Sequence, residues 1–279
     1  MTMNYDQVKK HWDSWAKEYG TSLRATTKSM TIKQLEIFAI MKHIVPGKNV
    51  LDVGCGNGYN DMAYIENISN INVVGVDYSK DMIDNAILNM KKLTLDQQQR
   101  LKFAVADALA LPYNEEFDIV TTDRCIINLT DIEMQKKAID NCAKALKQGG
   151  LFLMLENSQQ NYKKQNDARE AVGLPKRMPP SFNLFFDEDV ILPYCKSQGL
   201  ELVQIDDFGS LHDLMLYVIL TAADPNKEHY DEPAIVKAAE VTMNLAAKGH
   251  GYPFGSFGQN RLYILRKSKG GTNGKEVNA

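Results

Sequence analysis

A regular alternation of short apolar runs and helix-forming segments, between residues 49 and 155, constrains this chain more than any other feature. The apolar runs are bounded by Gly, Asp or Asn, and amphipathic stretches separate them. We predict strands over 49–53, 71–76, 101–105, 117–121 and 151–155. Strands that are apolar almost throughout and that alternate with helices are typical of a parallel sheet covered on both faces. The sequence therefore predicts a doubly wound α/β fold.

The alternation extends beyond this region, but two stretches interrupt it. We predict further helices over 5–19, 31–43, 59–67, 80–92, 133–147, 187–197 and 233–247, and further strands over 200–205 and 261–266. The interruptions, 158–186 and 209–258, are expected to be insertions on the substrate side of the sheet. Together these elements predict a seven-stranded, mostly parallel, Rossmann-like sheet in a single domain over 1–268, with 269–279 as a disordered tail.

Composition narrows the class of protein. The chain has 279 residues, is 44% hydrophobic and carries a formal charge of −3, so non-specific binding to nucleic acid through phosphate contacts is not expected. The longest apolar runs, such as 214–220, are too short to span a membrane. Four cysteines lie far apart without a Cys-x-x-Cys pair, which argues against a zinc site or disulfides. We expect a cytoplasmic protein, a monomer or homodimer, without a metal ion and without a membrane partner.

Four positions at the ends of predicted strands point to a ligand site, because ligands bind at the carboxyl ends of parallel strands. The loop 54–58 supplies closely spaced glycines before a helix, and Asp77 follows the next strand. A carboxylate there can accept from both hydroxyls of a ribose. The pair 107–108 is placed to meet an adenine edge, and the turn 123–125 completes the set. Each position alone is also explained as a helix cap or a tight turn, but the four together favour a nucleotide-type ligand.

These segments resemble the sequence motifs of class I S-adenosylmethionine-dependent methyltransferases. The matching segments, in the family's order, are VLDVGCGNG (50–58), VVGVDYS (73–79), ADALALP (106–112), FDIV (117–120) and ALKQGG (145–150). The segment 12–19, WDSWAKEY, is similar to the N-terminal lid helix of the small-molecule members, with Trp12 in place of a tyrosine. A spacing of Gly-x-Gly-x-Gly weighs against a dinucleotide dehydrogenase. The resemblance implies a helical lid over 1–45 and a cofactor-binding core over 49–157.

The resemblance also implies roles for individual residues toward S-adenosylmethionine. Asp77 is expected to bind the ribose hydroxyls, and Asp107 to accept from the adenine amino group. Tyr19 is expected to close over the sulfonium, where an aromatic face would make a cation–π contact; packing of the lid helix on the core is an equally good explanation. The complete expected cofactor set is Trp12, Tyr19, Asp52, Gly54, Cys55, Gly56, Gly58, Asp77, Tyr78, Met82, Asp107, Ala108, Asp123 and Arg124.

The residues that would act on the methyl acceptor are less well defined by the sequence. We consider Tyr19, Glu156 and His212 as catalytic candidates, with Asp123, Arg124, Asn128 and His250 as further contacts. A salt bridge or cap for Glu156 and a surface position for His212 are the structural alternatives. The basic residues of the first insertion, Arg169, Lys176 and Arg177, suit either an anionic substrate or a solvated loop.

The expected function is methyl transfer to an oxygen or nitrogen of a small polar metabolite, with a sugar or polysaccharide precursor as the first choice. The alternatives are N-methylation of an amine or amino sugar and a non-catalytic protein that binds the cofactor for regulation. An RNA or protein acceptor is less favoured, since the chain is slightly acidic and has no basic tract.

Overall fold

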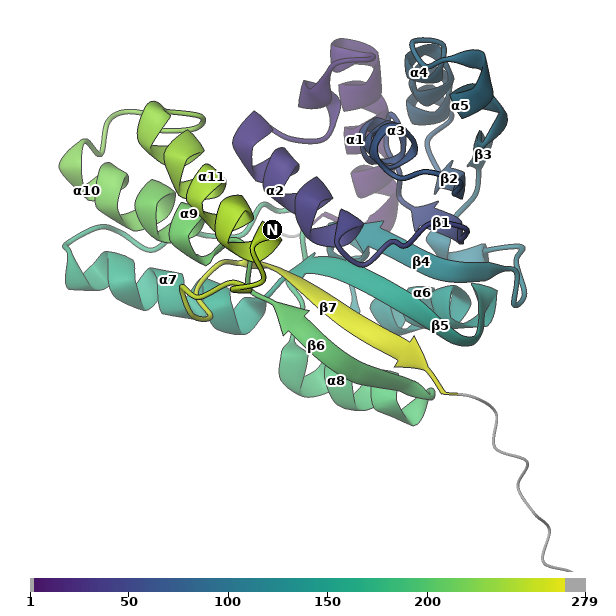
Figure 1. Ribbon diagram of the computed structural model, residues 1–279. Coiled ribbons are helices and arrows are strands. Elements are labelled where there is room, and N and C mark those ends of the chain that lie inside the picture. The colour runs from purple at the N-terminus through teal and green to yellow at the C-terminus, as the bar shows by residue number, and fades with distance from the viewer. Residues whose placement is uncertain (1–2, 269–279) are drawn as a thin grey trace, which may run out of the picture.

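The structure is a computed structural model and describes residues 3–268, so the predicted tail over 269–279 lies outside the described residues. A seven-stranded sheet in the order β3-β2-β1-β4-β5-β7-β6 forms its centre (Figure 1). The strands are β1 (Asn49–Val53), β2 (Asn72–Asp77), β3 (Leu101–Val105), β4 (Phe117–Asp123), β5 (Leu146–Asn157), β6 (Leu200–Asp206) and β7 (Asn260–Lys267). β7 runs antiparallel to both of its neighbours, β5 and β6, and the other four strand pairings are parallel. The predicted doubly wound, mostly parallel α/β fold is confirmed.

Helices cover both faces of this sheet, as Figure 1 shows. Their bounds are α1 (Tyr5–Tyr19), α2 (Met30–Met41), α3 (Tyr59–Asn67), α4 (Lys80–Met90), α5 (Leu95–Gln99), α6 (Ile132–Ala145), α7 (Gln159–Ala171), α8 (Glu188–Ser197), α9 (Ser210–Leu214), α10 (Thr221–Ala223) and α11 (Pro233–Ala247). On one face, Ile139 of α6 and Cys195 of α8 join the buried core. On the other, Leu35 of α2, Ile65 of α3 and Ala239 of α11 do so. Burial on both faces explains why the strands are apolar almost throughout.

Local sequence signals set most element ends. Ser79 caps α4, since its hydroxyl accepts from the Met82 N–H at 3.3 Å. One boundary prediction is wrong: the helix predicted over 133–147 ends at Ala145, and the glycines at 149–150 lie inside β5, which begins at Leu146. The pairing with β4 shifts register just there, and Gly149 has φ +77°. A glycine pair accommodates this bulge, which explains its place within a strand.

The two predicted insertions contain more helix than the sequence indicates. The first holds α7, whose buried side includes Asn161 and Gln165. Asn161 donates to the Gly258 carbonyl, and Gln165 donates to the Asp213 carboxylate. The second begins with α9, a π-helical turn over Met215–Leu220 and α10. These helices pack partly through buried polar side chains, so they lack the apolar stripe that identifies an amphipathic helix.

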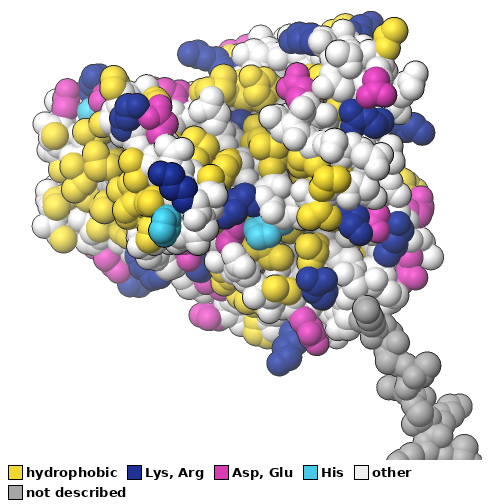
Figure 2. Space-filling model, viewed as in Figure 1, with side chains coloured by type: hydrophobic (Ala, Val, Ile, Leu, Met, Phe, Trp, Pro, Cys, Tyr) yellow, Lys and Arg dark blue, Asp and Glu magenta, His cyan; other side chains and the backbone are white. Residues whose placement is uncertain are grey.

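The helices after β6 also leave apolar surface uncovered. Figure 2 shows hydrophobic side chains gathered on the left of the view, over the region of α10 and α11. Ile219 and Val241 in this region are exposed. Among the helices of residues 3–268, none combines the length and apolarity needed to cross a membrane.

Candidate active site

The glycine loop after β1 adopts a backbone that suits glycine at each turn. Gly54, Gly56 and Gly58 have φ values of +79°, +55° and +77°. The N–H groups of Gly54 and Cys55 both donate to the Val76 carbonyl, which ties the loop to the end of β2. A Cβ atom at Gly54 would overlap the Cys125 sulfur, and one at Gly58 would lie 2.5 Å from the Phe103 ring. A side chain at Gly54 or Gly58 would therefore collide with a packed neighbour, which explains why glycine stands at these positions.

Replacing Gly54 with alanine tests how much the stability of the loop depends on the close contact between the Gly54 backbone and Cys125. Gly47 has a similar φ of +82° but nothing within 4 Å of the Cβ position, so it is a matched control. We expect Gly47→Ala to cost about 1–2 kcal/mol of unfolding free energy, from the left-handed backbone alone. Gly54→Ala should cost about 1–3 kcal/mol more, because the added methyl group overpacks against Cys125. Urea unfolding of both variants measures the difference; equal losses would contradict the packing argument.

Asp77 lies at the end of β2, where its carboxylate accepts two hydrogen bonds from the protein and can accept more. One carboxylate oxygen accepts from the Gly56 N–H at 3.0 Å and the other accepts from the Ser79 N–H at 2.9 Å. A carboxylate can accept about four hydrogen bonds, so each oxygen keeps a lone pair for a ribose hydroxyl. Burial raises the pKa of Asp77 to about 6, although the two backbone donors oppose that shift. The side chain lines the cavity described below, as a ribose ligand requires.

The residues expected around the adenine fall into two groups. Tyr78, Met82 and Ala108 line the cavity beside Asp77. Asp107 does not line it, because its carboxylate accepts from the Tyr5 hydroxyl at 2.9 Å and pairs with Lys9 at 2.8 Å. Both partners belong to α1, so an adenine contact with Asp107 would require these contacts to open.

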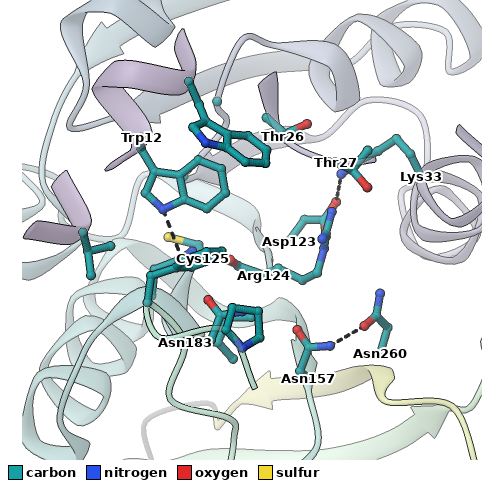
Figure 3. Close-up of a pocket in the computed structure, with 18 of the residues that line it drawn as sticks. Trp12, Thr26, Thr27, Lys33, Asp123, Arg124, Cys125, Asn157, Asn183 and Asn260 are labelled. Atoms are coloured by element: carbon teal, nitrogen blue, oxygen red, sulfur yellow. Dashed lines mark hydrogen bonds and ion pairs between the residues drawn. The ribbon is translucent and has the colours of Figure 1, made fainter. Parts of the chain in front are cut away.

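A single cavity of about 410 Å³ connects the glycine loop to the insertions. This volume lies within the range of small-molecule and cofactor sites, about 300–1,000 Å³. Figure 3 shows Trp12 above Cys125, with Asp123 and Arg124 at the centre of the view and Asn157 and Asn260 below them. Gly54, Cys55 and Gly56 line the cavity, whereas Asp52 and Gly58 do not. Asp52 is buried there and accepts from the Thr121 hydroxyl at 2.8 Å.

Two tryptophans of α1, rather than Tyr19, face this cavity. Trp12 and Trp15 line it, and Tyr19 packs on Trp15 with ring centroids 5.4 Å apart, outside the lining. The Trp12 indole N–H donates to the Asn128 carbonyl oxygen at 3.3 Å. Phe182 of the first insertion closes the group, with its ring centroid 5.7 Å from that of Trp12. The helix is therefore positioned to cover the cavity through Trp12 and Trp15, and the expected role of Tyr19 is not supported by its position.

A buried network of charges forms one wall of the cavity. Lys33 of α2 lies 2.5 Å from an oxygen of Asp123 and 3.1 Å from Glu36. Arg124, whose φ is +55°, lies 2.9 Å from Glu36. Asn260 of β7 also donates to Glu36, at 2.6 Å. The sequence prediction missed Lys33 and Glu36, although two charged residues on the apolar face of a helix were a signal available for it.

The ion pairs in this network keep Asp123 and Lys33 charged despite their burial. Burial alone would raise the pKa of Asp123, but Lys33 and Arg124 hold it below its usual value. Burial would lower the pKa of Lys33, yet Asp123 and Glu36 raise it. Asp123 is thus an ion-paired carboxylate that positions Lys33 and Arg124, and it is poorly suited to remove a proton.

The structure does not bring the other predicted catalytic residues to the cavity. Both Glu156 oxygens accept backbone N–H groups, from Ile126 at 3.0 Å and from Ile127 at 3.1 Å. His212 is buried against Asp213 at 2.8 Å, and neither His212 nor His250 lines the cavity. We therefore correct the sequence expectation: Glu156 holds the turn after β4, and His212 holds Asp213. Of the further contacts expected from the sequence, Asp123, Arg124 and Asn128 lie in the lining.

The variant Glu156→Gln tests whether the Glu156 carboxyl stabilises the turn after β4. Burial raises the pKa of Glu156 to about 8, although the N–H donors of 126 and 127 lower it. An acid whose pKa is raised on folding loses stability as the pH rises between its unfolded value and about 8. We expect the variant to cost about 1–3 kcal/mol near pH 5, through one lost N–H partner. The difference in unfolding free energy between the two proteins should become smaller toward alkaline pH, because only the unmodified protein loses stability as the carboxyl ionises. Urea unfolding over a range of pH measures it, and a difference that does not change with pH would contradict the assignment.

Several lining residues come from the insertions and were not predicted as site residues. They are Tyr162 of α7, Phe182 and Phe185 after it, Tyr217 of the π-helical turn, and Gln259 before β7. Because insertions carry no family motif, only their aromatic content marked them in the sequence. Among residues 3–268, no group of three or more His, Cys, Asp and Glu side chains is placed to hold a metal ion.

Comparison with known proteins identifies the family. A family model described as a methyltransferase domain matches residues 44–190, more than half of the chain. Phosphoethanolamine N-methyltransferase 3 of Arabidopsis thaliana is 26% identical over 198 residues, which cover 71% of this chain and 34% of that protein. Ubiquinone biosynthesis O-methyltransferase of Azoarcus sp. (strain BH72) is 28% identical over 184 residues, covering 64% of this chain and 76% of that one.

A solved structure shows the same fold. The crystal structure of the cyclase SpnF aligns with a TM-score of 0.61 at 16% identity, over 96% of this chain and 98% of that one. At that identity the likeness concerns the fold alone. The family match, the glycine loop and Asp77 agree on the cofactor. The chain belongs to the methyltransferase domain family, as a class I member whose cofactor is S-adenosylmethionine.

Proposed function

We propose that this protein transfers a methyl group to a nitrogen or oxygen atom of a small polar molecule bound in the same cavity as the cofactor. The observation that carries the proposal is the continuity of the cavity. Its lining runs from Gly54 and Asp77 to Tyr162, Arg177 and Tyr217 of the insertions. The chain spans only about a third of the plant relative it matches, so the activity rests on this geometry rather than on that relative.

The residues of the chain supply alignment and shielding. When bound, S-adenosylmethionine supplies a methyl group on a sulfonium, which a nucleophile displaces in line. Trp12 and Trp15 cover the cavity and exclude water, which favours this displacement. Their indole faces also suit a positively charged sulfonium.

The acid–base content of the lining favours a nitrogen acceptor. Within the described chain, the lining contains no histidine and no glutamate, and its two aspartates, Asp77 and Asp123, are already engaged. An alcohol needs a base to remove its proton, whereas an amine needs only to be neutral when it attacks. N-methylation of an amine or amino sugar therefore has more support than transfer to a hydroxyl of a sugar or polysaccharide precursor.

Production of S-adenosylhomocysteine tests the proposal. The protein would be incubated with S-adenosylmethionine and separate pools of small amines, amino sugars, sugars and hydroxy acids, with RNA and denatured protein as comparison. We expect turnover with a small-molecule pool, most of all with amines. Turnover only with RNA or protein would contradict the proposal. Cofactor binding without turnover in any pool would favour the alternative of a non-catalytic, regulatory protein.

A further inference from the structure

The insertions place an arginine in the cavity without a carboxylate partner. Arg177 lines the cavity and is half-buried. Its Nη1 group donates to the side-chain oxygens of Gln165 at 3.1 Å and Gln259 at 3.2 Å. No carboxylate of residues 3–268 forms an ion pair with it, and its Nε and Nη2 groups make no hydrogen bond within that part of the chain. Three N–H donors of a permanent cation are therefore available.

The guanidinium is fixed in place by its surroundings. Its central carbon lies 3.5 Å from the Tyr217 ring centroid and 5.2 Å from that of Tyr162. The Arg177 backbone exchanges two hydrogen bonds with the Asn166 side chain, at 2.9 Å and 3.1 Å. The π-helical turn carries Tyr217, and such turns are frequent at functional sites. Stacking and backbone anchoring hold the fork of donors in one orientation, which lowers the entropy cost of binding.

A second polar group in the same part of the cavity lacks a partner. Tyr162 is 6% exposed, lines the cavity, and its hydroxyl makes no hydrogen bond among the described residues. An unsatisfied buried hydroxyl costs free energy, so such groups mark places where a ligand supplies the missing partner. The hydroxyl can donate to an anion that the guanidinium also holds.

The neighbouring charges do not neutralise Arg177 directly. Asp213 accepts from the Gln165 amide at 2.8 Å and the Gln259 N–H at 2.7 Å, so it reaches Arg177 only through those glutamines. Arg169 is buried and donates to the Tyr217 carbonyl at 2.5 Å, which adds positive charge nearby. Lys176 does not line this cavity, but it borders a second pocket together with Tyr162 and Arg177, and it pairs with Glu170 at 3.2 Å.

We propose that Arg177 and Tyr162 form a subsite that binds an anionic group, a carboxylate or a phosphate, carried by the methyl acceptor. This inference rests on the proposed function and adds the substrate class to it. A guanidinium fork matches the oxygen spacing of both anions, and its unpaired N–H groups gain charge-assisted hydrogen bonds. Acceptors that lack an anionic group would leave Arg177 and the Tyr162 hydroxyl without partners, so they are disfavoured.

The tryptophans provide a direct readout of this subsite. The chain has two tryptophans, and both line the cavity, so their fluorescence reports occupation. The protein would first be saturated with S-adenosylhomocysteine and then titrated with inorganic phosphate or acetate at constant ionic strength. We expect a saturable change with at least one anion. Which anion binds more tightly distinguishes a phosphate from a carboxylate acceptor.

Matched variants assign the response to Arg177. Arg177→Met keeps an unbranched side chain against Tyr217 and should weaken anion binding by about tenfold or more, the effect of losing charged hydrogen bonds. Tyr162→Phe removes only the hydroxyl and should weaken it severalfold. Lys80→Met, which removes an exposed lysine of α4 that lines neither this cavity nor the pocket beside Lys176, should leave it unchanged. If the methionine variant fails to fold, Arg177→Lys serves in its place. It keeps the positive charge but lacks the forked guanidinium donors, so it should also weaken anion binding.

The outcomes separate this inference from the proposed function. If S-adenosylhomocysteine binds but neither anion gives a saturable change, the anion subsite is wrong and the cofactor site stands. The subsite is also overturned if the Arg177 and Tyr162 variants bind the anion as tightly as the unmodified protein. If S-adenosylhomocysteine itself does not bind, the proposed function fails first.

Discussion

Replacing Lys33 with methionine is expected to lower the free energy of unfolding by about 3–5 kcal/mol, the usual cost of breaking a buried ion pair from one side. Lys33 is 4% exposed and contacts both Asp123 and Glu36. Without it, Arg124 remains as the cation of the network beside two buried carboxylates. Desolvation of an unpaired carboxylate is the physical source of the loss. Urea unfolding at neutral pH measures it.

A matched control and a second variant make this prediction specific. Lys80→Met removes an exposed lysine that pairs with Asp84, and we expect almost no change in stability there. Adding Glu36→Gln to Lys33→Met removes one charge of each sign and should recover part of the loss. If Lys33→Met were as mild as Lys80→Met, the buried charges would not form the wall described above.

Replacing Asp77 with asparagine is expected to weaken S-adenosylmethionine binding about 5- to 150-fold, equivalent to about 1–3 kcal/mol. The amide can accept from only one of the backbone donors, Gly56 or Ser79, and it loses the charge that favours the ribose hydroxyls. Asp84→Asn, on the exposed side of α4, is the control and should bind normally. Calorimetry gives both affinities; equal values would remove Asp77 from the ribose site.

The affinity should also depend on pH through Asp77. The ribose hydroxyls donate to the ionised carboxylate, whereas burial raises the pKa of Asp77 to about 6 in the protein without ligand. Binding therefore competes with protonation, and affinity should fall as the pH drops through about 6. Asp77→Asn should lack this dependence. A pH-independent affinity in the unmodified protein would contradict the role.

The fold could be read from the sequence because its stability resides in apolar strands. The strand 49–53 is predicted with the bounds that the structure shows, and four of its five residues are buried. The strand 101–105 also has its predicted bounds, although it lies at the edge of the sheet and only Leu101 is buried. The helix α7 escaped prediction because buried polar residues, Asn161 and Gln165, hold it through hydrogen bonds to distant segments. Periodicity methods detect apolar faces and have no signal for such packing.

The residues of the site also fall into those that the sequence predicts and those that it does not. The loop 54–58 and Asp77 lie where the motifs predict because backbone conformation and strand order fix them. Glu156 lies near the end of β5 and His212 follows β6, but their side chains contact backbone N–H groups and Asp213, and neither lines the cavity. Arg177 faces the cavity only because α7 and the π-helical turn surround it. Such long-range placement has no local sequence signature.

Calorimetric titration of the unmodified protein with S-adenosylmethionine and with S-adenosylhomocysteine tests the central claim most directly. The account predicts that one molecule of each compound binds per chain, with the demethylated product at least as tight, because the glycine loop and Asp77, to which we assign the adenosine, line the cavity. Absence of binding by both compounds would contradict the account: the cavity would then serve another ligand, and the proposed methyl transfer would fall with it.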